Sequence, residues 1–469
     1  MSFESSRRRF LRSGLLAPSL ARATPFTAAL AAAGQAAAQS ANDYRALVCV
    51  FLFGGNDQGN TVLATDPDSW SAYRALRGTG SSPIALPAAG DAGGVLPIAP
   101  ATAQGGRSFA LHPALGDLAD LFAAGQAAVL ANVGTLIAPM TRDDYDEQRV
   151  PRPPKLFSHN DQQSVWQSSR PEGARTGWGG RLGDHSAGLN ATSIFTCMST
   201  GENAVWLAGE QTIPFRAGTS GATEIVGLTG SLFGSPTAAA LYRDIVTSDS
   251  PQYFERAHAG VVRRAIDAQA ALNDAMIASS ALEPAPRTPS GGTNGLAVQL
   301  NTVARIIGAR TALGARRQLF FVGLGGFDTH DDQLTRHAGL LGSLGQALAY
   351  FQRLLADPAV GASNDVTTFT ASDFGRTMAS NGDGTDHGWG SHHFVVGSAV
   401  RGGDIYGRFP VIGIDTPDDV GRGRLLPVQS VDQYAATLAG WFGLSPSLID
   451  DVFPNLVNFG SARDLGFML

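Results

Sequence analysis

Lysine is nearly absent from this 469-residue sequence, in which Lys155 stands alone among 34 basic residues. The chain therefore has no lysine-rich patch, and its 40 acidic residues give it a net charge of −6. A protein that binds nucleic acid usually carries a strong excess of positive charge. We therefore exclude nucleic acid as a partner.

Cysteine and long hydrophobic runs are also scarce. Cys49 and Cys197 are the two cysteines, and the sequence leaves open whether they pair, because Cys49 lies in an apolar run typical of a buried thiol. After the N-terminal region, no segment reaches the roughly 18 uninterrupted apolar residues that a membrane span requires. We expect no membrane span.

The N-terminal region has the pattern of an export signal. Residues 6–12, Ser-Arg-Arg-Arg-Phe-Leu-Arg, match the twin-arginine motif. An Ala- and Leu-rich stretch follows and ends in three alanines at 36–38, where a signal peptidase requires small residues. We predict that residues 1–38 are a twin-arginine signal peptide and that residues 39–469 are periplasmic or secreted. Export in the folded state is compatible with a metal loaded beforehand.

The rest of the chain alternates between strand-like and helix-like patterns. Apolar runs predict strands, and spacings near 3.6 predict helices. Strands are expected at 45–53, 127–133, 317–324 and 365–371, and helices at 113–125, 251–278, 296–315 and 332–356. This alternation predicts an α/β fold, a three-layer α/β/α sandwich with a mostly parallel sheet. Residues 190–232, rich in Thr, Ser, Gly, Ile and Val, predict a small β-rich insertion that caps the domain.

Acidic and histidine residues gather in the loops after these predicted strands. They occur at 54–57 (Gly-Gly-Asn-Asp), 325–330 (Gly-Gly-Phe-Asp-Thr-His) and 372–376 (Ser-Asp-Phe-Gly-Arg), and 384–393 adds three histidines. Ligands of open α/β sheets bind beyond the carboxyl ends of the strands, so these loops should converge. Mixtures of carboxylate and imidazole bind divalent metals.

Each of these features also has a purely structural interpretation. A Gly-Gly-Asn-Asp loop is often a turn stabilised by its own side chains. Asp328 suits a helix cap, and Asp373 suits an ion pair with Arg376. His392 and His393 are neighbours in a predicted strand, so at least one of them must point away from the site. The combination of all four loops is what favours a metal site.

A candidate nucleophile lies upstream, where Ser-His-Asn-Asp precedes a predicted helix. Ser158 or Asn160 would be the N-cap. A hydroxyl at a helix N-terminus beside a divalent cation is well placed to ionise and to meet a phosphate or sulfate group. Helix capping alone explains the same pattern, so both interpretations stay open.

Taken together, these motifs resemble an exported bacterial family, DUF1501, which is grouped with the alkaline phosphatase and sulfatase superfamily. The resemblance runs from about residue 45 to the end of the chain. It implies an alkaline phosphatase-like fold with one or two divalent ions (Zn, Mn or Ca) above the sheet. The metal ligands it implies are Asp57, Asp328, His330, Asp373 and His387.

The same resemblance implies roles for the remaining polar residues. Ser158 would be the nucleophile, and Arg376 would clamp the anion. Candidate substrate contacts are Asn56, His159 and His392.

The sequence also departs from the superfamily pattern. Phe374 follows Asp373 where a histidine is common, and one residue separates Asp328 from His330 where a longer gap is usual. Either the second metal is held differently or one metal is bound. No Cys-x-Pro-x-Arg sequence surrounds Cys197, which argues against a formylglycine sulfatase.

We therefore predict an exported metal-dependent hydrolase of a small phosphate, sulfate or related anionic ester, with Ser158 or a metal-bound water as nucleophile. The alternative is a scaffold of the same fold that binds a metal, a ligand or a protein partner in the periplasm without turnover. Loss of turnover but not of metal in Ser158→Ala would favour the enzyme.

Overall fold

The computed structural model describes residues 43–469, apart from 202–203, 220, 223–225, 229 and 280–281. The predicted signal peptide at 1–38 lies outside the described residues, and so does its cleavage point. The description below concerns the compact unit Tyr44–Leu469.

A large, mostly parallel sheet forms the middle layer, as predicted. Its central strand β1 (Arg45–Phe53) runs parallel to β9 (Arg317–Gly325) on one side and to β10 (Val366–Ser372) on the other. The antiparallel strand β13 (Ser391–Val396) joins β10 to β5 (Ala127–Gly134). The strand order is β14-β5-β13-β10-β1-β9-β6-β7-β8, with β15 also paired to β5.

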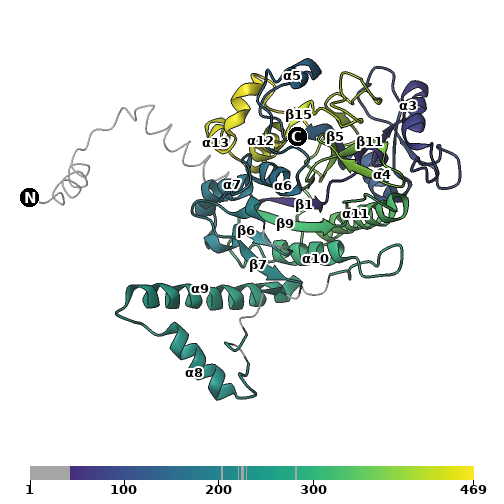
Figure 1. The fold of residues 1–469 in the computed structure, drawn as a ribbon. Coiled ribbons are helices and arrows are strands. Elements are labelled where there is room, and N and C mark those ends of the chain that lie inside the picture. The colour runs from purple at the N-terminus through teal and green to yellow at the C-terminus, as the bar shows by residue number, and fades with distance from the viewer. Residues whose placement is uncertain (1–42, 202–203, 220, 223–225, 229, 280–281) are drawn as a thin grey trace, which may run out of the picture. The chain divides into compact units, whose positions relative to one another are not determined.

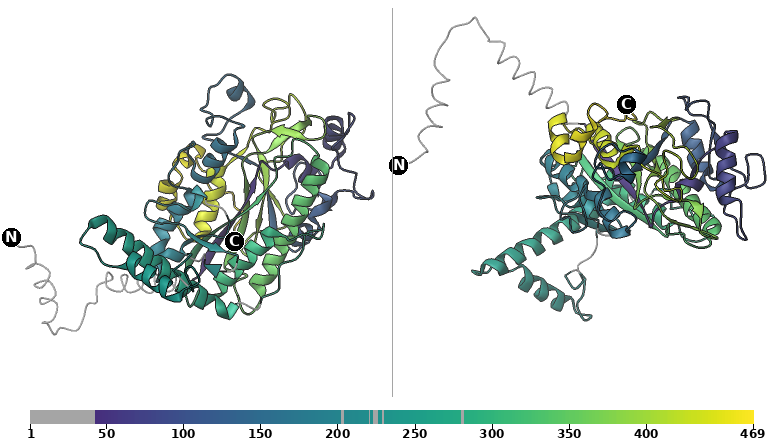
Figure 2. Two further views of the ribbon diagram at one scale, coloured as in Figure 1. Left: turned by 60° about the horizontal axis from the view of Figure 1, so that its bottom comes forward. Right: turned by 45° about the horizontal axis from the view of Figure 1, so that its top comes forward.

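Helices cover both faces of this sheet (Figures 1 and 2). Alternate side chains of β1 point to opposite faces, as in any strand. Val48 and Val50 belong to the core shared with α10 (Gly295–Gly308) and α11 (Gln333–Ala356). Leu47 and Phe51 belong to the second core, shared with α7 (Trp178–Ser186) and α12 (Val431–Phe442). The fold is the predicted three-layer α/β/α sandwich.

The other elements are shorter or lie at the edges. The helices are α3 (Pro67–Arg77), α4 (Gly116–Ala123), α5 (Arg142–Asp146), α6 (His159–Ser168), α8 (Pro236–Thr247), α9 (Tyr253–Met276) and α13 (Pro446–Val452). The strands are β2 (Val62–Ala64), β3 (Leu96–Ile98), β4 (Phe109–Leu111), β6 (Cys197–Ser199), β7 (Phe215–Gly218), β8 (Gly221–Ala222), β11 (Arg376–Ser380), β12 (Thr385–His387), β14 (Ile405–Tyr406) and β15 (Gln429–Ser430).

Residues 190–232, expected as a β-rich insertion, contribute strands to the main layer. Their strand β6 pairs in parallel with β9, and β7 and β8 follow it at the edge of the same sheet. The segment extends the sandwich at this edge. Its short 3-10 turns and two-residue strand explain why the sequence shows little periodicity there.

The two cysteines are buried and free. Cys49 lies on β1 and Cys197 on β6, with β9 between them. Two strand spacings of about 4.8 Å separate their backbones by more than a disulfide allows. The structure therefore resolves the open question: these thiols do not pair. Among the described residues, no helix is both long and apolar enough to cross a membrane.

Candidate metal centre

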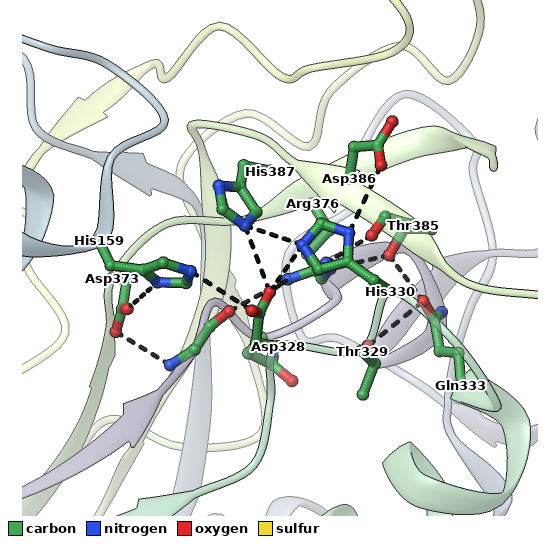
Figure 3. A network of polar contacts seen from close by, with 12 residues as sticks. His159, Asp328, Thr329, His330, Gln333, Asp373, Arg376, Thr385, Asp386 and His387 are labelled. Atoms are coloured by element: carbon green, nitrogen blue, oxygen red, sulfur yellow. Dashed lines mark hydrogen bonds and ion pairs between the residues drawn. The ribbon is translucent and has the colours of Figure 1, made fainter.

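Asp328 is the centre of a cluster of three histidines at the carboxyl edge of the sheet. Its Oδ1 lies 3.0 Å from Nε2 of His330 and 3.3 Å from Nε2 of His387, and its Oδ2 lies 3.5 Å from Nε2 of His159. The four side chains come from the start of α6, the loop after β9 and the end of β12 (Figure 3). The sheet thus brings together residues that are far apart in the sequence.

Each imidazole meets an oxygen at its other nitrogen. His159 Nδ1 lies 2.6 Å from Asp373 Oδ2, and His387 Nδ1 lies 2.7 Å from the carbonyl oxygen of Phe157. A carbonyl only accepts hydrogen bonds, so neutral His387 donates from Nδ1 and keeps a lone pair on Nε2. His330 Nδ1 lies 3.5 Å from Asp386 Oδ1. This arrangement, with an oxygen behind each ring, is typical of histidines that bind metals.

The spacing of the donor atoms fits a tetrahedral metal ion. Ligands at 2.0–2.1 Å from a zinc ion in a tetrahedron lie about 3.3 Å apart, and the contacts of Asp328 lie on both sides of that value. The two Nε2 atoms of His330 and His387 are 3.0 Å apart. One ligand atom each from His159, Asp328 and His387 also fits within 4.8 Å of the other two. Two or three imidazoles and one carboxylate suit a borderline divalent ion such as zinc.

The charges around the cluster favour an ionised Asp328 and a neutral His387. Burial opposes the ionisation of Asp328, but the hydrogen bond and charge of Arg376, with smaller contributions from His330 and His159, hold its pKa below the usual value. Burial lowers the pKa of His387. The hydrogen bond to Asp373 raises the pKa of His159, although partial burial opposes this. Without a cation, His159 is therefore protonated more often than His387. A cation that binds at the cluster must displace this proton.

Arg376 positions Asp328 from the protein interior. Its side chain is fully buried, and its Nη1 donates to Asp328 Oδ1 at 2.8 Å and to the carbonyl oxygen of Gly54 at 3.1 Å. Its Nε donates to Thr385 Oγ1, and Nη2 contacts the carbonyl oxygen of Thr385. All three nitrogens are in use, so the predicted anion clamp lies behind the cluster and holds its carboxylate.

Gly54 allows the loop after β1 to approach the loop after β9. Its φ is +113°, and a Cβ there would lie 2.4 Å from the backbone nitrogen of Asp328. Its own N–H donates to Asp373 Oδ1 at 3.2 Å. Any side chain at Gly54 would push the Asp328 loop away, so this glycine sets the spacing between the two carboxylates.

The helix α6 presents His159 and Gln163 on one face. They are four residues apart, which places them on neighbouring turns. Both contact the same oxygen of Asp373, His159 at 2.6 Å and Gln163 Nε2 at 2.8 Å. Asp373 is completely buried, so its interactions fix α6 against the end of β10. Asp373 was predicted as a metal ligand. In the structure it lies behind His159, on the side away from Asp328, and orients the His159 ring.

Phe157, just before α6, carries a strained backbone. Its φ is +72°, which is unusual for a bulky residue. This conformation points its carbonyl oxygen at His387, while its ring packs under the guanidinium of Arg424 at 4.7 Å. Arg424 Nε in turn donates to the carbonyl oxygen of His387. The strain at Phe157 is thus coupled to the orientation of a predicted ligand.

Asp57 lies away from this cluster, in a buried ion pair. Its oxygens accept hydrogen bonds from Arg77 at 2.6 and 2.7 Å, from Gln333 Nε2 at 2.5 Å and from the N–H of Gly59 at 3.2 Å. Burial would raise its pKa, but Arg77 holds it below the usual value. Its oxygens are fully used by these donors, so we leave Asp57 out of the proposed ligand set.

Asn56 and His392, expected as substrate contacts, are buried among structural partners. Asn56 Oδ1 lies 2.9 Å from His337 Nε2, and its amide nitrogen donates to Thr61 at 3.1 Å. His392 Nδ1 accepts from the N–H of Asn132 at 3.0 Å, and its ring packs on Phe409. Neither residue contacts the cluster around Asp328.

Ser158 is the N-cap of α6, next to His159. Its hydroxyl donates to Asp161 Oδ2 at 2.9 Å. Asp161 carries a second contact, with Lys155 at 3.6 Å. In this conformation the hydroxyl is directed along the first turn of its own helix.

Several residues of the site escaped the sequence analysis. Gln163 had a signal, because it follows His159 by four residues in a predicted helix. Asp386 had a weaker signal, because it stands next to His387 in the same motif, on β12. The Phe157 carbonyl and the counter-ion Arg77 had none, since a backbone oxygen and a residue on α3 are assigned only by tertiary packing.

Comparisons with known proteins place the chain among related sequences. The model of a family described as "Protein of unknown function (DUF1501)" matches residues 44–453. No curated protein matches the chain.

Solved structures give distant likenesses only. One is Ps i-CgsB in complex with k-i-k-neocarrahexaose, with 10% identity, a TM-score of 0.31 and coverage of 90% of this chain and 77% of that chain. Another is a Bacteroides thetaiotaomicron protein described with the metabolism of multiple glycosaminoglycans, with 11% identity, a TM-score of 0.35 and coverage of 87% and 75%. At these TM-scores neither likeness bears on the chemistry.

Proposed function

The chain belongs to the DUF1501 family, and we propose that it is an exported, metal-dependent hydrolase of a small phosphate, sulfate or related anionic ester. The observation that carries this proposal is the convergence of three Nε2 atoms on the carboxylate of Asp328. Three converging imidazoles around one carboxylate cost free energy unless a cation or a proton lies between them. The twin-arginine pattern supports a periplasmic or secreted location.

In this proposal His159, Asp328 and His387 hold one divalent ion, and His330 is the fourth group at its edge. The exposed fractions of these side chains range from 24% for His387 to 42% for Asp328. A substrate can therefore approach the cluster without a rearrangement of the sheet. The bound ion would supply Lewis-acid chemistry, which neutralises charge on an anionic ester and lowers the pKa of a water molecule.

The residues around the ion have separate tasks. Asp373 orients His159, the Phe157 carbonyl orients His387, and Arg376 keeps Asp328 ionised and fixed. Such support from behind the ligands preserves the geometry of a site while the substrate binds and leaves. Arg422 pairs with Asp386 at 2.6 Å and so fixes the carboxylate that faces His330 Nδ1.

The geometry favours water over Ser158 as the nucleophile. The Ser158 hydroxyl already donates to Asp161, and no contact joins it to the cluster within the described part of the chain. We therefore assign Ser158 a role at the start of α6, where it helps to fix His159.

The test is the metal content of protein purified without chelator, measured by mass spectrometry. We expect about one equivalent of a divalent ion in the wild type and its loss in His159→Ala and Asp328→Asn. His258→Ala is the matched control, because His258 is an exposed histidine on α9. A metal-free wild type, or variants that keep their metal, would contradict the proposed site.

Turnover is tested separately with aryl phosphate and aryl sulfate esters. We expect the metal-loaded wild type to hydrolyse one of them, and Ser158→Ala to retain activity within about tenfold, because the change removes only the hydrogen bond to Asp161, worth roughly 1 kcal/mol. A loss of all turnover in Ser158→Ala with its metal retained would restore Ser158 as the nucleophile.

The second candidate is a metal-binding scaffold without turnover. It is favoured by one observation: the predicted clamp Arg376 and the predicted nucleophile Ser158 are both engaged with protein groups. Metal bound at full occupancy with no hydrolysis of any tested ester would support this candidate.

A further inference from the structure

The helices α8 and α9 form a hairpin that extends away from the sheet (Figures 1 and 2). Its first helix has little to pack against. Of the twelve residues of α8, only Ala239 is buried. Leu241 is 58% exposed and Ile245 is 71% exposed. Isolated helices of this length are marginal in water, so an amphipathic face such as this one normally packs against a partner.

The exposed apolar residues of α8 lie on one face. Ala238, Leu241 and Ile245 are spaced by three and four residues, which gives a continuous stripe along the helix. Asp244 borders this stripe. The buried Ala239 lies on another side, where α8 meets α9.

An open groove lies beside the middle of α9. A cavity of about 460 Å³ opens there, a volume within the range of binding sites for small molecules and side chains. Ile213 lies just before β7 and Phe215 is its first residue, and α9 contributes Val261, Arg264 and Ala265. Ile213 is 80% exposed, so this wall is apolar and accessible.

The groove holds one acidic and one basic side chain, Asp184 and Arg264. Asp184 is engaged with its own loop, because it accepts three backbone N–H groups, from residues 210 to 212. Arg264 makes no ion pair in the described part of the chain, and neither does Asp244 on α8. One molecule therefore carries an arginine in its groove and an aspartate on its exposed helix that can pair across two copies.

Within one molecule, α8 packs on another side of α9 and so does not fill this groove. Arg263 Nη1 donates to the carbonyl oxygen of Thr247 at the end of α8. Val261 lies two residues away, about 160° around the helix. The face of α9 that holds α8 is therefore nearly opposite to the face that lines the groove.

We propose that α8 of one copy of this chain packs into the groove of a second copy, and that the exchange is reciprocal. Leu241 and Ile245 enter the apolar groove, and Asp244 pairs with Arg264 of the other molecule. Each copy contributes one α8 and one groove, so the two contacts are identical and the assembly closes as a two-fold dimer.

The exposed area is of the size that such a dimer needs. The large apolar side chains in question are Ile213, Leu241, Tyr242, Ile245, Phe254 and Val261, all exposed by 41% or more. Burying roughly 100 Å² on each approaches the about 800 Å² per partner of a standard interface. Exposed patches larger than a few hundred Å² are unusual on monomers.

Sedimentation velocity of the full protein across micromolar concentrations tests this proposal. We expect a mass of two chains for the wild type. Asp244→Arg and Arg264→Asp should each weaken the dimer by about tenfold or more, because each places two like charges together. The two changes in one chain should restore it, since the pair is re-formed with exchanged signs. Asp120→Arg, at an exposed position of α4 outside the hairpin, is the matched control.

Other outcomes would overturn the dimer. They are a monomer at every concentration, a double variant as weak as the single variants, or binding of the wild type to lipid vesicles without self-association. A double variant that is correctly folded but monomeric would also overturn the proposal. Circular dichroism of each variant shows whether the hairpin remains helical, so a folding defect is distinguishable from a lost interface.

Discussion

Asp57 and Asp328 occupy equivalent positions in the chain but opposite environments in the structure. Each follows a neighbouring parallel strand, β1 or β9, by a few residues. Asp57 is completely buried and meets Arg77, whose side chain is also fully buried. Asp328 is 42% exposed and faces three imidazoles.

The comparison shows that a position beyond a strand end does not by itself make a metal ligand. The decisive factor is what neutralises the carboxylate. Arg77 saturates Asp57 with two short hydrogen bonds, whereas Arg376 contacts one oxygen of Asp328 and leaves the carboxylate open to Nε2 atoms. The Asp57 region therefore stabilises the loop, and the Asp328 region is left to bind a cation.

Matched asparagine variants should separate the two roles, with the largest effect at Asp57. We expect Asp57→Asn to reduce the free energy of unfolding by about 3–5 kcal/mol, because it leaves Arg77 buried and unpaired. Asp328→Asn should cost less, about 1–3 kcal/mol, since the buried Arg376 loses its counter-charge but keeps the amide oxygen and its other acceptors, and it should abolish metal binding. Urea unfolding and metal analysis of both variants provide the measurements.

A further variant controls for the ion pair. Replacing Asp57 by Leu and Arg77 by Met together should recover much of the lost stability, because no buried charge is left alone. If Asp57→Asn instead loses the metal while keeping its stability, Asp57 is a ligand and the separation of the two regions is wrong.

Much of the fold was predictable because the periodicity of the chain is strong where the sheet is buried. The predicted strand at 45–53 coincides with β1, and the predicted helix at 332–356 differs from α11 by one residue at its start. The antiparallel direction of β13 was not predictable, since a buried strand has the same apolar pattern in either direction. The solvent-exposed α8 was missed because nothing in the part of the chain that the structure describes covers its apolar face.

For the site, the sequence located the loops but not the division of tasks among them. His387 and Asp328 were expected as ligands and lie in the cluster. His159 was expected to contact substrate and lies in the cluster around Asp328, because its ring turns toward Asp328 when Asp373 holds Nδ1. Such orientations depend on hydrogen bonds between residues more than 200 positions apart, which no local pattern encodes.

Asp373 sharpens the distinction between ligands and the residues behind them. Asp373→Asn should weaken metal binding by 10–100-fold without abolishing it, because the carboxylate orients His159 and raises its basicity. Competition with a chelator of known affinity measures the change. Gln163→Leu, which removes a neighbouring donor to the same oxygen, should have a smaller effect. Complete loss of the metal in Asp373→Asn would instead make Asp373 a direct ligand.

The smallest effect we expect is a change in the acid sensitivity of the fold, and it contrasts buried histidines with those of the cluster. Burial lowers the pKa of His392 to about 3. Its folded value is therefore below the unfolded value of about 6.5, so its contribution to stability is complete above pH 6.5 and is lost as the pH falls. The hydrogen bond to Asp373 raises the pKa of His159, so protonation of His159 favours the folded state.

In metal-free protein between about pH 6.5 and 5, above the range where most carboxyl groups titrate, His392→Gln should therefore flatten the decline in unfolding free energy. The limit is about 1.4 kcal/mol per pH unit for one histidine. His159→Gln should act instead above about pH 6.5, where it removes the gain in unfolding free energy that His159 gives as the pH falls toward 6.5, because the folded protein binds this proton more tightly. Urea unfolding at several pH values measures both slopes. If both variants change the slope of unfolding free energy against pH in the same direction, the pKa values of His392 and His159 are not shifted in opposite directions.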